Sequence, residues 1–435
     1  MRYTTDGPLP VMIKTRAVKM ALVLLGILLA LALVEAGVRI HSLRSLRGPG
    51  SRTSFFEFDE TVGWRLIPGA QGLESADEYA VRLKINSKGL RDIERDYRKE
   101  EGVFRIVVLG DSFMEAYQVP LEASFSRVLE SELNAAKASG RRIEVVNLGI
   151  RDYGTAQEYL YFLSEGLKYH PDLVLLAFFP GNDVRNNSRK LENGLWSEDL
   201  FQVAARPFFE PDASSGLTLH VPQAQKAIDS IRGAKRRSTW RGFFAARSLA
   251  YRLIAGRIER RGRSLRPRRA SFAIGPTYGQ YSSAYSPEWE EAWRVTKGIL
   301  AKWDQGCRKE GIPLVVFSVP SVFETDPPYR EAIFQAHPEL TASGLDVEKP
   351  ERILAAFARE EGFHFLALLP RFRRQALETG ERLHFFDDGH WNERGHASAA
   401  GWVARYLIEE RLLGSASPPS AEGALSGSHR PRARR

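Results

Sequence analysis

The sequence predicts an α/β fold in which a parallel sheet is covered by helices on both faces. Short apolar runs rich in β-branched residues alternate along the chain with long amphipathic stretches. The apolar runs lack the in-out alternation of a half-exposed strand, which indicates strands that are buried on both faces. Each run is followed by a stretch long enough to form the helical crossover that parallel strands need.

The elements follow in order along the chain. The strand candidates are residues 104–109, 144–148, 173–179, 314–319 and 363–368. The helix candidates are residues 123–138, 155–169, 287–310, 351–361 and 393–412. In open parallel sheets the reactive groups lie beyond the carboxyl ends of the strands, so the segments after these runs are the places where chemistry is expected.

Composition excludes several classes of protein. With 435 residues, 43% of them apolar, and one cysteine, the chain is neither disordered nor a disulfide-stapled miniprotein. The formal charge of +9 is uneven: residues 232–269 hold 14 Lys and Arg against one acidic residue, and residues 1–52 hold 8 against 2. A chain that is acidic outside these basic segments favours contact of the segments with an anionic surface such as a membrane. The alternative is that the arginines are simply solvated. We expect no nucleic-acid partner.

The domain organisation follows from these patterns. Residues 1–19 form a short N-terminal segment, and the apolar run 20–38 is predicted to be a single membrane-spanning anchor, with a cleaved signal peptide as the alternative. Residues 39–54 are a linker, residues 55–413 a globular domain, and residues 414–435 a disordered basic tail. We expect the globular domain to lie outside the cell membrane, in the periplasm or the exterior.

An insertion at about residues 188–286 exceeds any connection that a compact sheet needs. Within it, residues 238–261 have the apolar spacing of an amphipathic helix. That helix, within the Arg-rich 232–269 segment, either lies on anionic lipid or packs on the globular domain.

A candidate nucleophile follows the first strand. Gly110-Asp111-Ser112-Phe113 allows a sharp turn that exposes the Ser112 hydroxyl before a helix-compatible segment. Taken alone, the tetrapeptide is ordinary turn composition.

Candidate oxyanion donors follow the next two strands. Gly149 ends one strand and Asn182 lies just after another. A glycine N–H and an asparagine amide are suitable donors if they share an edge of the sheet with the serine.

A candidate base precedes the last helix. Asp387 stands three residues before His390, so one compact loop can supply a base and the carboxylate that orients it. The neighbouring Asp388, His384 and His396 leave a metal site as the rival interpretation.

These four blocks, in this order, resemble those of the SGNH/GDSL hydrolases, with phenylalanine at position 113 where the family name has leucine. Gly63–Pro68 and Ile85–Arg91 also look like the leader of membrane-anchored bacterial members. The resemblance implies a three-layer α/β/α sandwich with a five-stranded, mostly parallel, flavodoxin-like sheet. It also implies Ser112 as nucleophile, His390 as base, Asp387 as its orienter, and an oxyanion hole formed by Ser112, Gly149 and Asn182.

The predicted function is therefore a serine-dependent ester hydrolase that acts through an acyl-enzyme, without cofactor or metal. Its expected partner is an ester substrate, such as an O-acylated envelope glycan or a lipid. The alternatives are an O-acyltransferase for cell-surface polysaccharide and a non-catalytic envelope scaffold. Sequence gives neither the substrate nor the oligomeric state.

Overall fold

A computed structural model describes residues 18–23, 25–26, 29–30, 33, 55–195, 205–212, 216–221, 278–342 and 344–414. The chain divides into two units, the first comprising residues 1–51 and 231–270 and the second residues 52–230 and 271–435. Nearly all described residues belong to the second unit, which contains the sheet and every predicted site residue.

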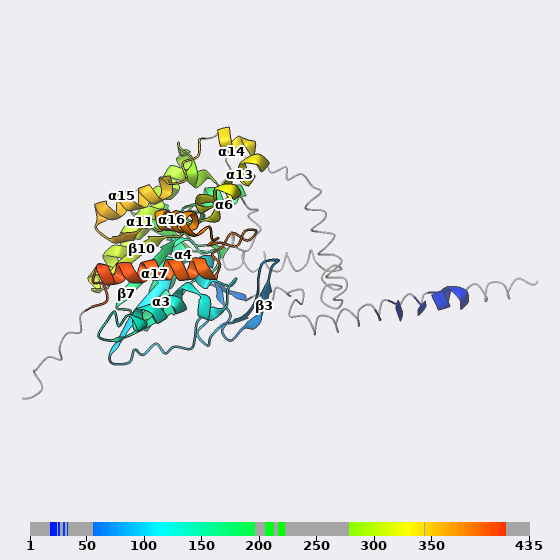
Figure 1. Ribbon diagram of the computed structural model, residues 1–435, viewed down its shortest axis with the longest axis horizontal. Coiled ribbons are helices and arrows are strands. Elements are labelled where there is room, and N and C mark those ends of the chain that lie inside the picture. The colour runs from blue at the N-terminus through cyan, green and yellow to red at the C-terminus, as the bar shows by residue number, and fades with distance from the viewer. Residues whose placement is uncertain are drawn as a thin grey trace, which may run out of the picture. The chain divides into compact units, whose positions relative to one another are not determined.

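A five-stranded sheet forms the centre of the second unit (Figure 1). Its strands are β5 (Val103–Leu109), β6 (Arg142–Asn147), β7 (Leu173–Phe178), β10 (Leu314–Ser318) and β11 (His364–Leu366). They lie in the order β11-β10-β7-β5-β6, and every pairing is parallel. The order reverses direction between β5 and β7, which is where open sheets of this kind bind ligands.

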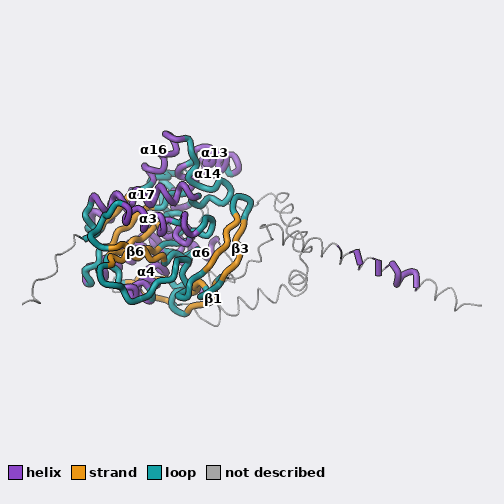
Figure 2. The backbone as a smooth tube through the Cα atoms, turned by 60° about the horizontal axis from the view of Figure 1, so that its bottom comes forward, coloured by secondary structure: helices purple, strands orange, loops and turns teal. Residues whose placement is uncertain are grey.

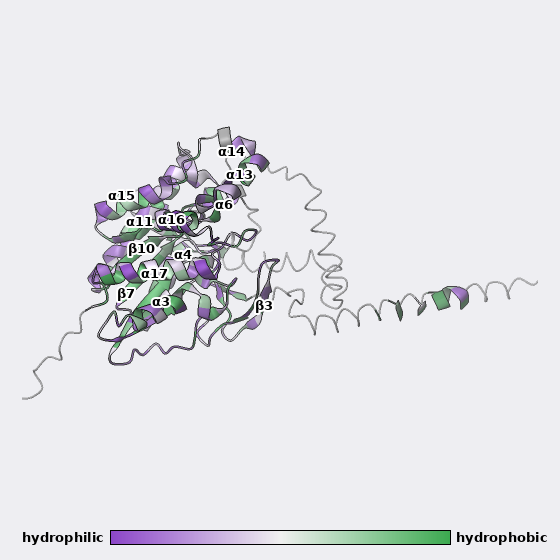
Figure 3. Ribbon diagram, viewed as in Figure 1, coloured by the Kyte–Doolittle hydropathy of each residue, from purple (hydrophilic) through white to green (hydrophobic). Residues whose placement is uncertain are grey.

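Side chains of each strand alternate between two apolar cores. In β5, Val107 and Leu109 join one core, and Ile106 and Val108 join the other. The first core packs under α4 (Thr155–Ser164), α11 (Pro287–Lys309) and α15 (Lys349–Glu361), and the second under α3 (Phe125–Ala135), α16 (Leu369–Thr379) and α17 (Glu393–Glu409). The predicted three-layer α/β/α sandwich with a five-stranded parallel sheet is confirmed, and Figure 3 shows the apolar strands between the helices.

Shorter elements complete the described chain. They are α2 (Ser112–Glu115), α5 (Asp183–Asn186), α6 (Arg189–Leu195), α12 (Val322–Thr325), α13 (Pro327–Ala336) and α14 (Pro338–Ala342), with 3-10 turns at Leu121–Ala123, Gly166–Tyr169 and Gly279–Tyr281. The five strands predicted for the central sheet and the five helices predicted around it are present, most with ends shifted by a few residues.

Three antiparallel hairpins are additions that the sequence patterns did not predict. They are β1 (Phe56–Asp59) with β2 (Gly63–Leu66), β3 (Gln71–Ser75) with β4 (Ala80–Lys84), and β8 (Phe208–Pro211) with β9 (Leu217–His220). Figure 2 shows the first two at one side of the folded unit. β8 and β9 lie within the predicted 188–286 insertion, and buried Phe209 joins the first core.

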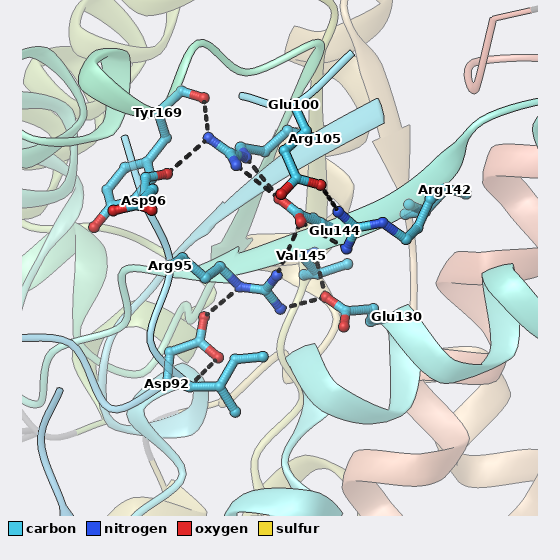
Figure 4. A network of polar contacts seen from close by, with 12 residues as sticks. Asp92, Arg95, Asp96, Glu100, Arg105, Glu130, Arg142, Glu144, Val145 and Tyr169 are labelled. Atoms are coloured by element: carbon cyan, nitrogen blue, oxygen red, sulfur yellow. Dashed lines mark hydrogen bonds and ion pairs between the residues drawn. The ribbon is translucent and has the colours of Figure 1, made fainter. Parts of the chain in front are cut away.

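A buried polar network ties the segment before β5 to the sheet (Figure 4). Arg95 forms ion pairs with Asp92 and with Glu130 of α3. Asp92 Oδ2 also accepts the backbone N–H of Asn147, at the end of β6, at 3.0 Å. Moving this segment away from the sheet would leave buried charges without their partners, which is energetically costly. The network therefore holds the segment in place.

The predicted anchor falls mostly outside the described residues. Those of its positions that are described, 20–23, 25–26, 29–30 and 33, are helical. No helix in the described parts of the chain is long and apolar enough to cross a membrane. The predicted helix at 238–261 and nearly all of the 414–435 tail also lie outside the described residues.

Candidate active site

Ser112 lies at the carboxyl end of β5, as predicted, and is the first residue of α2. Asp111 caps this turn, since its Oδ1 accepts the N–H of Phe113 at 2.9 Å. The side chain of buried Arg91 holds the far end of α2 by donating to the carbonyls of Glu115 and Ala116, both at 2.7 Å. The serine is therefore fixed from both ends of its helical turn.

His390 lies on the loop between α16 and α17. The loop closes on itself, because Phe385 N–H donates to His390 O at 2.8 Å and Gly389 N–H to Phe385 O at 3.1 Å. Gly389 has a φ of +83°, a left-handed conformation that a residue without Cβ adopts at little cost. This turn directs the imidazole toward β5.

The structure brings Ser112 and His390 into contact. Ser112 Oγ lies 2.7 Å from His390 Nε2, and His390 Nδ1 lies 2.6 Å from Asp388 Oδ1. Because the carboxylate can only accept, Nδ1 carries the proton and Nε2 is left to accept the serine hydroxyl. This is the arrangement in which a base can activate a serine.

The prediction that Asp387 orients the histidine is wrong by one residue. Asp388 holds the imidazole, whereas the Asp387 side chain is exposed and makes no hydrogen bond or ion pair with the described residues. Gly389 makes a left-handed turn, and Asp388 Oδ1 lies 3.4 Å from the backbone N of His390 as well as 2.6 Å from Nδ1, so the carboxylate two residues before the histidine is the one that reaches the ring. Spacing along the sequence could not reveal that turn.

Asp388 is held by more than the histidine. Tyr79 OH donates to its Oδ2 at 3.1 Å, and Gln118 Nε2 to its Oδ1 at 3.2 Å. Burial works against the charge, but the hydrogen bond to His390 and the contact with Tyr79 leave the pKa of Asp388 below its ordinary value. The carboxylate is therefore ionised at neutral pH.

The three predicted oxyanion donors differ in whether their N–H groups already have an acceptor. Asn182 Nδ2 donates one hydrogen to Asp111 Oδ2 at 2.8 Å, which leaves its second hydrogen. The Ser112 N–H has no acceptor among the described residues. Gly149 lies against α2, but its N–H already donates to Asn147 Oδ1 at 3.0 Å, so an oxyanion would have to share or replace that acceptor.

Three buried carboxyl groups, those of Asp111, Glu158 and Asp183, lie close enough to one another to interact electrostatically. Burial raises the pKa of Asp111 to about 6, and burial together with neighbouring acids raises those of Glu158 and Asp183 well above the ordinary range. Both Glu158 oxygens lack a hydrogen-bond partner among the described residues. Carboxyl groups so placed favour the neutral form.

The alternative interpretation was a metal site, but the described residues contain no group of His, Cys, Asp and Glu side chains placed to hold a metal ion. His384 Nε2 lies 3.0 Å from the carbonyl of Pro320. His396 is fully buried in the apolar core, and burial lowers its pKa to about 3. His384 and His396 thus lie in different environments and do not face a common site.

Comparison with known proteins gives structural similarity alone. No family model matches the sequence, and no curated protein matches it. An acetyl xylan esterase, AlAXEase, is similar at a TM-score of 0.35 and 13% identity, over 69% of this chain and 99% of that one. A catalytic mutant of the acetylxylan esterase Axe2 from Geobacillus stearothermophilus gives 0.35 and 11%, over 72% and 94%. A GDSL-like lipase from Bacteroides thetaiotaomicron gives 0.31 and 11%, over 71% and 88%.

Proposed function

We propose that this chain is a serine-dependent ester hydrolase, with Ser112 as nucleophile, His390 as base and Asp388 as the group that orients it. One observation carries the proposal: the continuous hydrogen-bonded chain from Ser112 Oγ through both imidazole nitrogens to Asp388. A serine hydroxyl is a weak nucleophile until such a base takes its proton.

The reaction follows from these positions. Ser112 Oγ attacks the ester carbonyl carbon while His390 Nε2 takes the hydroxyl proton, and Asp388 stabilises the imidazolium that forms. The carbonyl oxygen gains negative charge, which the Ser112 N–H and the free Asn182 hydrogen can bind. His390 then gives the proton to the departing alkoxide, and the bond from the carbonyl carbon to the leaving oxygen breaks.

The acyl group now on Ser112 is released by a second nucleophile. Water gives hydrolysis, and a sugar hydroxyl gives transfer. The same residues serve both outcomes, so an O-acyltransferase stays the alternative. Acetate release from an acetylated glycan, measured without and with an acceptor glycan, separates the two.

Covalent labelling tests the proposal directly. A fluorophosphonate probe should label the folded protein, and Ser112→Ala should abolish the labelling. Ser139→Ala is the matched control, because Ser139 precedes β6 and so lies at the edge of the parallel sheet opposite to Ser112. Undiminished labelling of the Ser112→Ala protein would refute the assignment.

The location of the enzyme is a separate proposal that rests on sequence. The apolar run 20–38 supports a membrane anchor with the catalytic domain outside. Resistance of the full-length protein to extraction with alkaline carbonate supports it, and release into the soluble fraction contradicts it.

A further inference from the structure

A carboxylate of the β3–β4 hairpin contacts the loop between α16 and α17 that carries His390, here called the catalytic loop. Glu78, in the turn between the two strands, accepts three consecutive backbone N–H groups of the loop that carries the base. The donors are Phe386 at 2.7 Å, Asp387 at 2.8 Å and Asp388 at 3.0 Å. Successive N–H groups that converge on one anion form a nest, and here the anion is part of the protein itself.

The next residue of the hairpin touches the catalytic carboxylate. Tyr79 OH donates to Asp388 Oδ2, and burial together with the Asp388 charge raises the pKa of Tyr79, so the hydroxyl keeps the proton that it donates. The Tyr79 ring packs on Phe385 at 5.5 Å and on Tyr117 at 6.3 Å between centroids. Tyr117 in turn lies 5.7 Å from the His390 ring.

The hairpin also contacts the other side of the site. Glu74 on β3 forms an ion pair with Arg151 at 3.4 Å. Arg151 lies two residues after Gly149, and its guanidinium pairs with buried Glu115 of α2, the helix that carries Ser112. One hairpin thus joins the loop of the base to the helix of the nucleophile.

We propose that the β3–β4 hairpin is a positioning element of the active site, in which Glu78 fixes the backbone of the catalytic loop and Tyr79 fixes the Asp388 carboxylate. The proposal rests on the proposed function, since it assigns these two residues to the same triad. Glu78 is exposed, so its bonds contribute little to global stability. Their effect is on geometry, because a displacement of about 1 Å at a reacting group can cost on the order of a hundredfold in rate.

Two conservative substitutions separate positioning from a merely structural role. Glu78→Gln keeps the shape but turns an NH₂ group toward backbone donors. We expect kcat to fall by roughly 10- to 100-fold, with KM changed by no more than about threefold, because the loop and not the substrate contact is disturbed. The matched control is Glu60→Gln, the same chemical change on an exposed carboxylate in the turn of the other N-terminal hairpin.

Tyr79→Phe removes one hydrogen bond from Asp388 and leaves the ring. The carboxylate then presents more of its charge to the imidazole, so the base should release its proton less readily. We expect the acid limb of kcat/KM against pH to move to higher pH by about half a unit. Tyr406→Phe, which removes a hydroxyl on α17 that lies 3.4 Å from His364 Nδ1, should leave the limb in place.

Hydrogen exchange of the full-length protein gives a readout that needs no substrate. The amides of residues 386–388 should exchange faster in Glu78→Gln than in the wild type and in Glu60→Gln. Unchanged exchange and unchanged kcat in Glu78→Gln would overturn the inference while leaving the esterase proposal intact. Faster exchange in a protein that the fluorophosphonate never labels would instead overturn the esterase proposal and keep the structural link between Glu78 and the loop.

Discussion

Replacing Asp388 by asparagine should remove most of the catalytic rate. The Asp388 carboxylate accepts from His390 Nδ1 at 2.6 Å, and an amide in its place supplies no negative charge for the imidazolium. Two unit charges about 4 Å apart interact by about 4 kcal/mol at an effective dielectric constant near 20. Since about 1.4 kcal/mol corresponds to a factor of ten, kcat should fall on the order of a thousandfold.

The neighbouring Asp387→Asn provides the matched control. It makes the same chemical change one residue away, on an exposed side chain without a hydrogen bond to the described residues, so we expect a change of no more than about threefold. The assay is steady-state hydrolysis of a chromogenic short-chain ester at neutral pH, with circular dichroism to show that both proteins are folded. A larger loss in Asp387→Asn than in Asp388→Asn would refute the assignment of the carboxylate.

Three further substitutions test the surroundings of the serine. Asn182→Ala should lower kcat by about a hundredfold or more with little effect on KM, since it removes an oxyanion donor, and an unchanged kcat in steady-state assays would exclude that role. Asp111 has a pKa of about 6 against an ordinary 3.8, so the folded state binds its proton more tightly than the unfolded chain and stability falls as pH rises through this interval. Asp111→Asn should lack that decline, worth up to about 3 kcal/mol, in urea unfolding at pH 4 and pH 7; equal pH dependence in both proteins would contradict it. Gly149→Ala would place a Cβ 2.5 Å from the backbone of Met114, so we expect a loss of about 1–3 kcal/mol in thermal unfolding, and an unchanged Tm would show that α2 can move aside.

The central sheet was predictable because its residues obey simple periodic rules. Runs such as Leu173–Phe178 are apolar on both faces, and each is followed by a helix with one apolar stripe, as in Pro287–Lys309. The hairpins carry weaker signals. β4 alternates exposed and buried residues over only five positions, and β3 has no fully buried residue. Val81 and Leu83 of β4 are buried by packing into the first core, which includes residues far along the chain.

The positions of the serine, the histidine and the asparagine in the fold were predictable for a related reason. Each follows a strand or precedes a helix at the one edge of the sheet where parallel strands end, so local sequence places it. The carboxylate was not, because its identity depends on a backbone turn at Gly389. Tyr79 and Glu78 carry no local signal at all, since they lie some 300 positions from the loop they contact.

The residues that precede β5 contact the elements that carry the proposed catalytic residues. Arg91 holds the carbonyls at the end of the serine helix, and Asp92 holds the end of β6, where Asn147 in turn accepts from Gly149. Glu78 and Tyr79 hold the loop of the base. A sheet with its helices could present Ser112 and His390 at one edge, but the relative placement of the two at hydrogen-bond distance depends on supports that come from this earlier segment. The segment between the predicted linker and the first central strand therefore belongs, with the sheet, to the unit that holds the proposed active site.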